Sequence, residues 1–441
     1  MTERIVRVLE QARKLVVPDA AAEAKTRSVA EKLLSRVSAA AKSHHEITGV
    51  FLGGSFAKGT WLPDDVDIDI FVEFDAGVDE KKFEEIGLKV GREAVRGHKY
   101  GKKYAQHPYT EALVDGFKAN IVPCYDVGPG EWKSAADRSM HHVTFVNENL
   151  DGELKTEVRL LKKFMKVVGV YGAEIEREGF SGYAAEVLVY IHRTFESALR
   201  SFETIRPKSD DVFFTLFDPI DKERDLGKAI SRETVARMVL ASRALFEKPA
   251  IDFFRKFKRK ERPHLLREVY LVAFEHKVLS EDTLWGELKR SARQVAKHVE
   301  REGFTLARFG AASDGLSSSA IILLPEVDTL PELEEREGPG VELFEGAKSF
   351  ASKNRKQAEL FWVGDDGRLR LLQKRRFKSL SQFLDTLLTS GVKEIGASRE
   401  IADAIERNGR VLHGERLRKE IREKGWLREG TASIISDPIG V

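Results

Sequence analysis

Two aspartates inside a strongly apolar stretch constrain this chain more than any other feature. Residues 66–74 are rich in β-branched and aromatic types, which favours a β-strand. Successive side chains of a strand point to opposite faces, so Asp67 and Asp69 project from the same face, about 7 Å apart. The pattern predicts a strand with one apolar face and one face that carries two carboxylates.

A glycine turn lies upstream of this strand. A short strand over 50–52 is expected to end in the turn Gly53–Ser55, followed by a helix over 56–61. Backbone N–H groups and a hydroxyl in such a turn suit a phosphate, and Lys58 adds a positive charge. Gly-Gly-Ser alone is commonly a plain turn, and Asp-x-Asp alone is common on solvated strands. Their order and spacing together favour a binding site for a phosphate group.

The two carboxylates also predict a metal site. Anions on an otherwise apolar strand repel one another and resist burial unless a cation accompanies them. Mg²⁺ is a hard ion that prefers oxygen ligands. A pair of Mg²⁺ ions would satisfy both Asp67 and Asp69.

Composition sets the class of molecule. The chain has 441 residues, enough for two to four domains, and its 42% apolar content supports real cores. We expect no membrane segment and no secretory signal, because no stretch is long and apolar enough. A single cysteine, Cys124, excludes an internal disulfide and fits a reducing, cytoplasmic location. The oligomeric state is not determined, and a homodimer is among the assemblies allowed.

The pattern along the chain predicts an α+β multidomain protein. We expect a catalytic domain over 1–136, a helical central domain over 137–255 and a C-terminal α+β part over 256–441. The expected elements include a strand at 118–123 and helices at 183–202 and 231–246. In the C-terminal part, strands at 268–274 and 318–324 flank a helix near 284–302 in a βαβ-like arrangement, and the acidic, glycine- and proline-containing stretch 332–340 is expected to be a loop.

A basic stretch in the C-terminal part is a candidate RNA-binding surface. Between 353 and 378 the positive charges are interleaved with Phe361, Trp362 and Phe377, a combination that suits phosphate contacts and base stacking. Most basic runs are only solvated faces, so both readings stay open. The candidate RNA-binding residues are Arg368, Arg370, Lys374, Arg375 and Arg376.

Several strings of the sequence resemble one family. They are Gly54–Leu62, Asp67–Phe71, His107–Tyr109, Ile121–Tyr125, Val158–Lys162, Val170–Glu174, Gly179–Tyr183 and Asp218–Asp221. Together they resemble the archaeal-type (class I) CCA-adding enzymes, which are tRNA nucleotidyltransferases of the polymerase-beta superfamily. The motifs cover residues 1 to about 240, and beyond that the resemblance rests on length and domain order.

The resemblance implies a polymerase-beta-like catalytic domain and an activity. Members of this family add C, C and A to the tRNA 3′ end from CTP and ATP without a nucleic-acid template. The tRNA partner would be held by its 3′ end and acceptor arm. The resemblance assigns Asp67 and Asp69 to two Mg²⁺ ions, and the nucleotide-binding positions are Gly54, Ser55, Lys58, His107, Lys162, Tyr171 and Arg224.

These assignments have ordinary alternatives. Taken alone, His107 is a turn residue, Lys162 a surface lysine, Tyr171 a core residue and Arg224 one charge among several. An arginine is usual in the family where Lys58 stands; lysine keeps the charge and loses the bidentate fork.

One departure from the family concerns the metal site. A third carboxylate is expected just before the Val-Pro string, and Asn120 stands there. An amide oxygen is a neutral ligand, so Asn120 is a weaker metal ligand than a carboxylate and cannot accept a proton. Asp115 and Asp126 are roughly 16 to 20 Å away along an extended chain. Asp65 shares the face of Asp67 if the strand begins early, and otherwise is a loop residue.

Two other functions stay open, and Asn120 bears on the second. One is a poly(A)-type or small-molecule nucleotidyltransferase, and the other is an RNA-binding protein with an impaired active site. The product formed from truncated tRNA with CTP, ATP or both distinguishes these alternatives.

Overall fold

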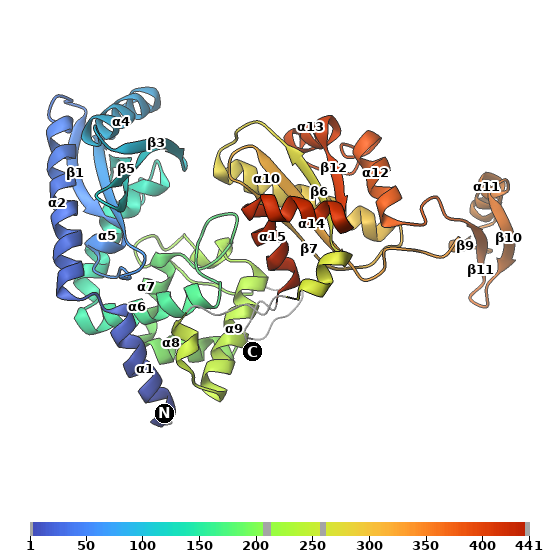
Figure 1. Ribbon diagram of the computed structural model, residues 1–441, viewed down its shortest axis with the longest axis horizontal. Helices are drawn as coiled ribbons and strands as arrows, with labels where there is room; N and C mark the ends of the chain where they lie inside the picture. Colours follow the sequence, from blue (N-terminus) through green and yellow to red (C-terminus); the bar gives the residue numbers. More distant parts are fainter. Residues whose placement is uncertain (1–2, 206–212, 256–261, 437–441) are drawn as a thin grey trace. The chain divides into compact units, whose positions relative to one another are not determined.

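The computed structural model describes residues 3–205, 213–255 and 262–436 (Figure 1). These residues form two compact units, divided between Lys260 and Glu261. The domain boundary expected at 255/256 borders the segment 256–261, which lies outside the described residues. The three-domain division stays a prediction.

A five-stranded sheet forms the core of the first part of unit 1. Its strands are β1 (Ile47–Gly53), β2 (Asp67–Asp75), β3 (Lys99–Tyr104), β4 (Pro108–Val114) and β5 (Phe117–Asp126), in the spatial order β1-β2-β5-β4-β3. β2 and β5 run parallel, and the other neighbours run antiparallel. The strands expected at 50–52, 66–74 and 118–123 are therefore confirmed.

One face of this sheet is covered by helices α2 (Ala20–Ala41) and α4 (Glu80–Ala94) (Figure 1). Along β2, Ile68 and Ile70 are fully buried against this layer, whereas Asp67 and Asp69 are only partly buried. The alternation is the one that the sequence predicts. It leaves the carboxylates on the face without this helical cover.

The rest of unit 1 is helical, as expected. Its α-helices are α1 (Glu3–Val16), α5 (Arg138–Asn149), α6 (Gly152–Val167), α7 (Gly182–His192), α8 (Phe195–Glu203) and α9 (Arg232–Glu247), with short 3₁₀ helices at Ala135–Asp137, Leu226–Ala229 and Ile251–Phe254. The single helix expected over 183–202 is divided. Arg193 ends α7 in a left-handed conformation with φ 66°, and the Thr194 side chain caps α8.

Unit 2 is built on a four-stranded antiparallel sheet. It follows the 3₁₀ helix Pro263–Glu268, and its strands lie in the order β12 (Arg410–His413), β6 (Tyr270–Glu275), β8 (Ser318–Pro325) and β7 (Leu306–Ser313). The strands expected at 268–274 and 318–324 are confirmed. The βαβ-like arrangement is wrong, because the unpredicted strand β7 reverses the chain and β6 pairs with β8 antiparallel.

Helices cover both faces of this sheet. α10 (Glu281–Arg301), α12 (Leu380–Ser390) and α13 (Arg399–Asn408) pack on one face, and α14 (Gly414–Glu423) and α15 (Gly425–Ile435) pack on the other. Val272 and Leu271, adjacent on β6, belong to the two opposite cores. Among the described helices, none has the length and apolar character needed to cross a membrane.

A second, three-stranded sheet in unit 2 corrects one expectation. Its strands are β9 (Leu333–Gly340), β10 (Ala358–Val363) and β11 (Arg368–Lys374), in the order β10-β11-β9, and α11 (Phe344–Asn354) packs against β9. The stretch 332–340 was expected to be a loop, and that is wrong. Acidic β9 pairs with basic β11, so cross-strand ion pairs compensate for its low intrinsic strand preference.

Candidate active site

The glycine turn brings the chain into contact with Asp69. Gly53 pairs with Asp69 across β1 and β2, and Gly54 has φ +62°. A Cβ atom on Gly54 would lie 1.8 Å from Asp69 Oδ2, so only glycine fits here. The following helix, α3, spans Gly54–Ala57. It is earlier and shorter than the helix expected over 56–61, because Gly59 leaves the helical region with φ +66°.

Three side chains lie together on the open face of the sheet. Asp69 and Asn120 are direct neighbours in the parallel pairing of β2 and β5, and Asp67 lies opposite Lys118. Asn120 Nδ2 donates a 2.8 Å hydrogen bond to Asp69 Oδ1. Burial raises the pKa of both Asp67 and Asp69, and the nearby Lys118 ammonium opposes this rise only in part. The carboxylates thus occupy a setting that a cation would stabilise.

The oxygen of Asn120 supports the same conclusion. Asn120 Oδ1 is buried and has no hydrogen-bond partner among the described residues. Its amide nitrogen donates to Asp69, so the group without a partner is an oxygen ligand beside two carboxylate ligands. This oxygen-only donor set fits Mg²⁺.

The other carboxylates considered for the third ligand lie in a loop, in a turn and at the end of a strand. Asp65 lies in the loop before β2, where its carboxylate pairs with Lys166, and Asp115 lies in the β4–β5 turn, 3.4 Å from Lys32 Nζ. Asp126 is the exposed last residue of β5. Asp65 and Asp115 are thus paired with lysines, although the charge of Asp65 still contributes to the raised pKa of Asp67.

Lys58 and Lys162 meet at one buried carboxylate. Glu186 on α7 accepts hydrogen bonds from Lys58 Nζ at 2.5 Å and from Lys162 Nζ at 2.8 Å. The Thr60 hydroxyl donates to Glu186 Oε1 at 2.6 Å and lies 2.9 Å from Lys162 Nζ. The lysines come from the loop after α3 and from α6, so α7 joins the glycine turn to the helical part of the unit.

Burial and charge act in opposite directions in this cluster. Burial lowers the pKa of Lys162 to about 8, although the Glu186 carboxylate raises it. Burial raises the pKa of Glu186, but Lys162 and Lys58 outweigh burial and bring it to about 2. Glu186 is therefore ionised near neutral pH, and the cluster carries net positive charge when both lysines are protonated.

Tyr171 lies beside the same cluster. A Cβ atom on Gly182 would lie 2.8 Å from Tyr171 Oη and 3.4 Å from Lys162 Nζ. Lys166 Nζ lies 4.7 Å from the centre of the Tyr171 ring. The two predicted residues Lys162 and Tyr171 therefore approach the start of α7 together, and glycine at 182 allows that approach.

Arg224 joins the cluster through residues that the sequence analysis did not assign. Its guanidinium pairs with Asp218 at 3.2 Å, and Asp218 also accepts a 2.9 Å hydrogen bond from Tyr183. His142 Nε2 lies 3.3 Å from Asp218, and its ring stacks on Tyr183 with centroids 3.6 Å apart. Lys58 Nζ lies 5.5 Å from the Tyr183 ring.

The sequence points to some of these unassigned residues and not to others. Tyr183 and Asp218 lie inside strings that resemble the family, so the sequence could have predicted a role for them in the site. His142 lies outside those strings, on helix α5, and only the fold places it against Asp218.

His107 lies apart from these groups. Its Nδ1 faces Glu84 at 3.4 Å and Glu80 at 3.6 Å, both on α4, and its ring contacts Phe83 edge-on. These are contacts to the helical layer on the opposite face from Asp67 and Asp69. A nucleotide contact for His107 stays a prediction.

The candidate RNA-binding residues lie in and just after β11. Arg370 pairs with Glu335 and Asp366, Arg368 with Glu337, and Arg375 with Glu334. Lys374 and Arg376 are exposed, and among the residues that the structure describes Lys374 has a single ion-pair contact, at 4.0 Å from Glu359. Much of the positive charge is thus matched by the acidic strand β9.

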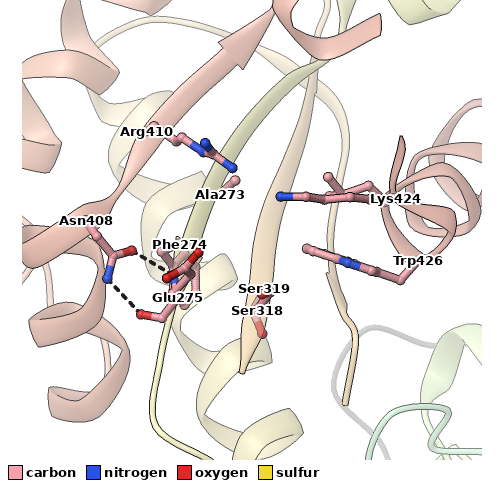
Figure 2. A pocket seen from close by; sticks show the side chains of 10 residues that line it. Ala273, Phe274, Glu275, Ser318, Ser319, Asn408, Arg410, Lys424 and Trp426 are labelled. Carbon is pink, nitrogen blue, oxygen red and sulfur yellow. Dashed lines mark hydrogen bonds between the residues drawn. The ribbon is translucent and has the colours of Figure 1, made fainter. Parts of the chain in front are cut away.

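Unit 2 also contains a pocket of its own (Figure 2). Arg410 and Lys424 line it, and both pair with Glu420, while Trp426 lies beside Lys424. Asn408 closes one side through hydrogen bonds to the Glu275 backbone. None of the residues predicted from the sequence lines this pocket.

The paired carboxylates, the glycine turn and the buried lysines define a nucleotidyltransferase. A nucleotidyltransferase domain model matches residues 34–141, and the models for the tRNA nucleotidyltransferase second domain and the CCA-adding enzyme C-terminal domain match residues 156–255 and 267–414. Nucleotidyltransferases of this fold typically use divalent metal ions. The chain belongs to the CCA-adding enzymes.

Relatives support this membership over nearly the whole length. The chain is 32% identical to the CCA-adding enzyme of Methanopyrus kandleri, across 93% of each chain. It is 33% identical to that of Pyrobaculum islandicum, across 87% of this chain and 94% of the relative. Among solved structures, the Cid1 poly(U) polymerase matches 58% of this chain and 99% of its own, with a TM-score of 0.43 and 13% identity.

Proposed function

We propose that this chain completes the 3′ end of tRNA by adding C, C and A from CTP and ATP, without a template. The observation that carries the proposal is the open-face group of Asp67, Asp69 and Asn120 joined through Gly54 to the Lys58–Lys162 cluster. One part offers oxygen ligands and the other offers buried positive charge. Metal ions held by such ligands and nearby positive charge both stabilise a triphosphate that reacts with a hydroxyl.

The chemistry assigns a role to each part. The tRNA 3′ hydroxyl loses its proton to water as its oxygen bonds to the α-phosphorus of the nucleotide, the bond from that phosphorus to the oxygen that bridges to the β-phosphorus breaks, and pyrophosphate leaves. Two Mg²⁺ ions, when bound, would stabilise the attacking and leaving oxygens. Asp67, Asp69 and Asn120 would hold them, because these three side chains present oxygens on one face of the sheet.

The triphosphate and base would be held by the helical part of the site. Ser55 and Lys58 follow the glycine turn, and Lys162 and Tyr171 approach from α6 and the segment after it. Ammonium groups in a buried setting bind phosphate oxygens more strongly than exposed ones. Arg224, oriented by Asp218, offers paired N–H donors to the edge of the incoming base.

The proposal is tested with a tRNA transcript that lacks its last three nucleotides. Incubation with CTP alone, ATP alone or both is followed by measurement of product length. We expect two additions with CTP and exactly one further A when ATP is also present, and no extension by Asp69→Asn. Long ATP-only tails would instead indicate a poly(A)-type enzyme, and tRNA binding without extension would indicate an RNA-binding protein with an impaired site.

A further inference from the structure

A third carboxylate lies on the strand beyond Asn120. Glu111 on β4 is the direct cross-strand neighbour of Asn120 on β5, which in turn is the neighbour of Asp69 on β2. Directly opposed residues on adjacent strands project from the same face of a sheet. Asp69, Asn120 and Glu111 therefore form one row across three strands, with Asn120 in the centre.

A lysine contact shows where the Glu111 carboxylate points. Lys118 Nζ lies 3.0 Å from Glu111 Oε2 and 3.9 Å from Asp67 Oδ2. Glu111 Oε2 and Asp67 Oδ2 therefore cannot be farther apart than the sum of their distances to Lys118 Nζ. The Glu111 side chain is about three-quarters buried, with 26% of its surface exposed. Glu111 thus leans over β5 toward Asp67, and one cation already contacts both acids.

The Asn120 oxygen lies within the same row. Its Oδ1 is buried without a partner among the described residues, while its Nδ2 donates to Asp69. Buried oxygens of this kind are nearly always satisfied by a donor or an ion. With carboxylates on both neighbouring strands, a cation is the partner that also neutralises the surrounding charge.

We propose that Glu111 supplies the third carboxylate of the metal centre, with Asn120 as a neutral ligand between Glu111 and Asp69. This inference rests on the proposed function, because it extends the same site by one strand. Lys118 is the positioning residue that holds Glu111 toward Asp67 when the metal ions are absent. A divalent ion that binds here would displace the Lys118 ammonium.

Direct Mn²⁺ binding to the full-length protein tests the proposal, with no nucleotide or RNA present. Free Mn²⁺ is followed by electron paramagnetic resonance during titration of the unmodified chain, Glu111→Gln, Asp69→Asn and Asp115→Asn. Asp115→Asn is the matched control, because it removes one carboxylate from the adjacent β4–β5 turn, where Asp115 pairs with Lys32. Circular dichroism establishes that each variant is folded.

We expect Glu111→Gln to weaken Mn²⁺ binding about 10-fold or more, a loss typical of groups that support a metal ligand set. Asp115→Asn should bind as the unmodified chain does. In a Glu111→Gln background, Asn120→Asp should restore much of the lost affinity, since it returns a carboxylate to the row.

The possible failures are distinguishable. If Asp69→Asn abolishes binding and Glu111→Gln leaves it unchanged, the role of Glu111 is refuted and the metal site stands. If Asp69→Asn also has no effect, or the unmodified chain binds no Mn²⁺, both the metal site and the role of Glu111 are refuted. An unfolded Glu111→Gln is replaced by Glu111→Asp, for which we expect a smaller loss of affinity, and unchanged affinity there counts against the proposal.

Discussion

The ammonium of Lys162 donates a 2.8 Å hydrogen bond to the carboxylate of Glu186, and both side chains are almost completely buried, with exposed fractions of 3% and 0%. Lys58 shares the same carboxylate, so one anion holds two cations beside the glycine turn. A buried ion pair contributes little net stability, but removing one partner leaves a buried charge without compensation.

We expect Glu186→Gln to reduce the free energy of unfolding by about 3 to 5 kcal/mol, because Lys58 and Lys162 lose their counter-ion. The measurement is urea unfolding followed by circular dichroism. Glu23→Gln, which removes an exposed partner of Arg27 on α2, should change stability by less than about 1 kcal/mol. Equal effects from the two variants would show that the buried cluster does not support the fold.

Nucleotide affinity should fall as the pH rises above about 8, because the pKa of Lys162 is lowered to about 8 and the neutral amine no longer attracts the triphosphate. The lysine is charged below this pH, so affinity is highest on the acidic side of the transition. Equilibrium binding of CTP between pH 6.5 and 9.5 measures it. Lys162→Arg keeps its charge over this range and should remove the transition, and a transition that persists there would assign it to another group.

Asn120→Asp should strengthen metal binding and raise turnover in CCA addition, because a carboxylate replaces a neutral amide beside Asp69. Without metal, the new carboxylate cannot replace the hydrogen bond that Asn120 Nδ2 donates to Asp69, and it repels the Asp69 carboxylate. The metal-free protein should therefore be less stable. Thermal unfolding with and without Mg²⁺, together with initial rates, measures both effects. Unchanged or lower turnover would contradict the benefit expected from a carboxylate at position 120.

Gly54→Ala should abolish nucleotidyl transfer, because the added Cβ would lie 1.8 Å from Asp69 Oδ2 and must displace the carboxylate. Gly97→Ala is the matched control. It also has positive φ, at +92°, but no atom lies within 4 Å of its added Cβ. Both variants carry backbone strain of roughly 1 to 3 kcal/mol, and only Gly54→Ala should lose activity. Similar activity in the two would argue against a special role for the turn.

Charge reversal at Lys374 and Arg376 should weaken binding to all tRNAs alike and reduce the slope of log affinity against log salt by about 2. These exposed residues are better targets than Arg370 or Arg375, whose substitution would also break ion pairs to acidic neighbours. Filter binding between 50 and 200 mM KCl, roughly the range over which counterion release is measured, gives the slope. An unchanged slope would show that Lys374 and Arg376 do not contact the tRNA phosphates.

Local pattern carried the prediction of the catalytic strand. The alternation of Asp67, Ile68, Asp69 and Ile70 depends only on the period of a strand, so the face that carries the carboxylates followed from the sequence. The same holds for α9, whose start is marked by the Ser231 cap. The family resemblance added Lys162, Tyr171 and Arg224. Lys162 and Tyr171 lie near the start of α7, and Arg224 pairs with Asp218, which binds Tyr183 there.

Non-local pairing accounts for what was missed. The stretch 332–340 has the composition of a loop, and it becomes β9 only because basic β11 lies beside it. His142 reaches Asp218 from a helix 76 residues away in sequence. No local feature of the sequence marks Glu111, because its proposed role depends on its pairing with Asn120 across β4 and β5.

The sequence by itself therefore determined the reaction class, through two carboxylates on one face of a strand after a glycine turn. Only the tertiary structure decided which further residues lie beside this group and the lysines: Glu111 by strand register, and Glu186 by the packing of α7 against the turn. The physical reason is that strand period and helix caps are encoded within a few residues. Register and packing depend on contacts between segments far apart in the chain.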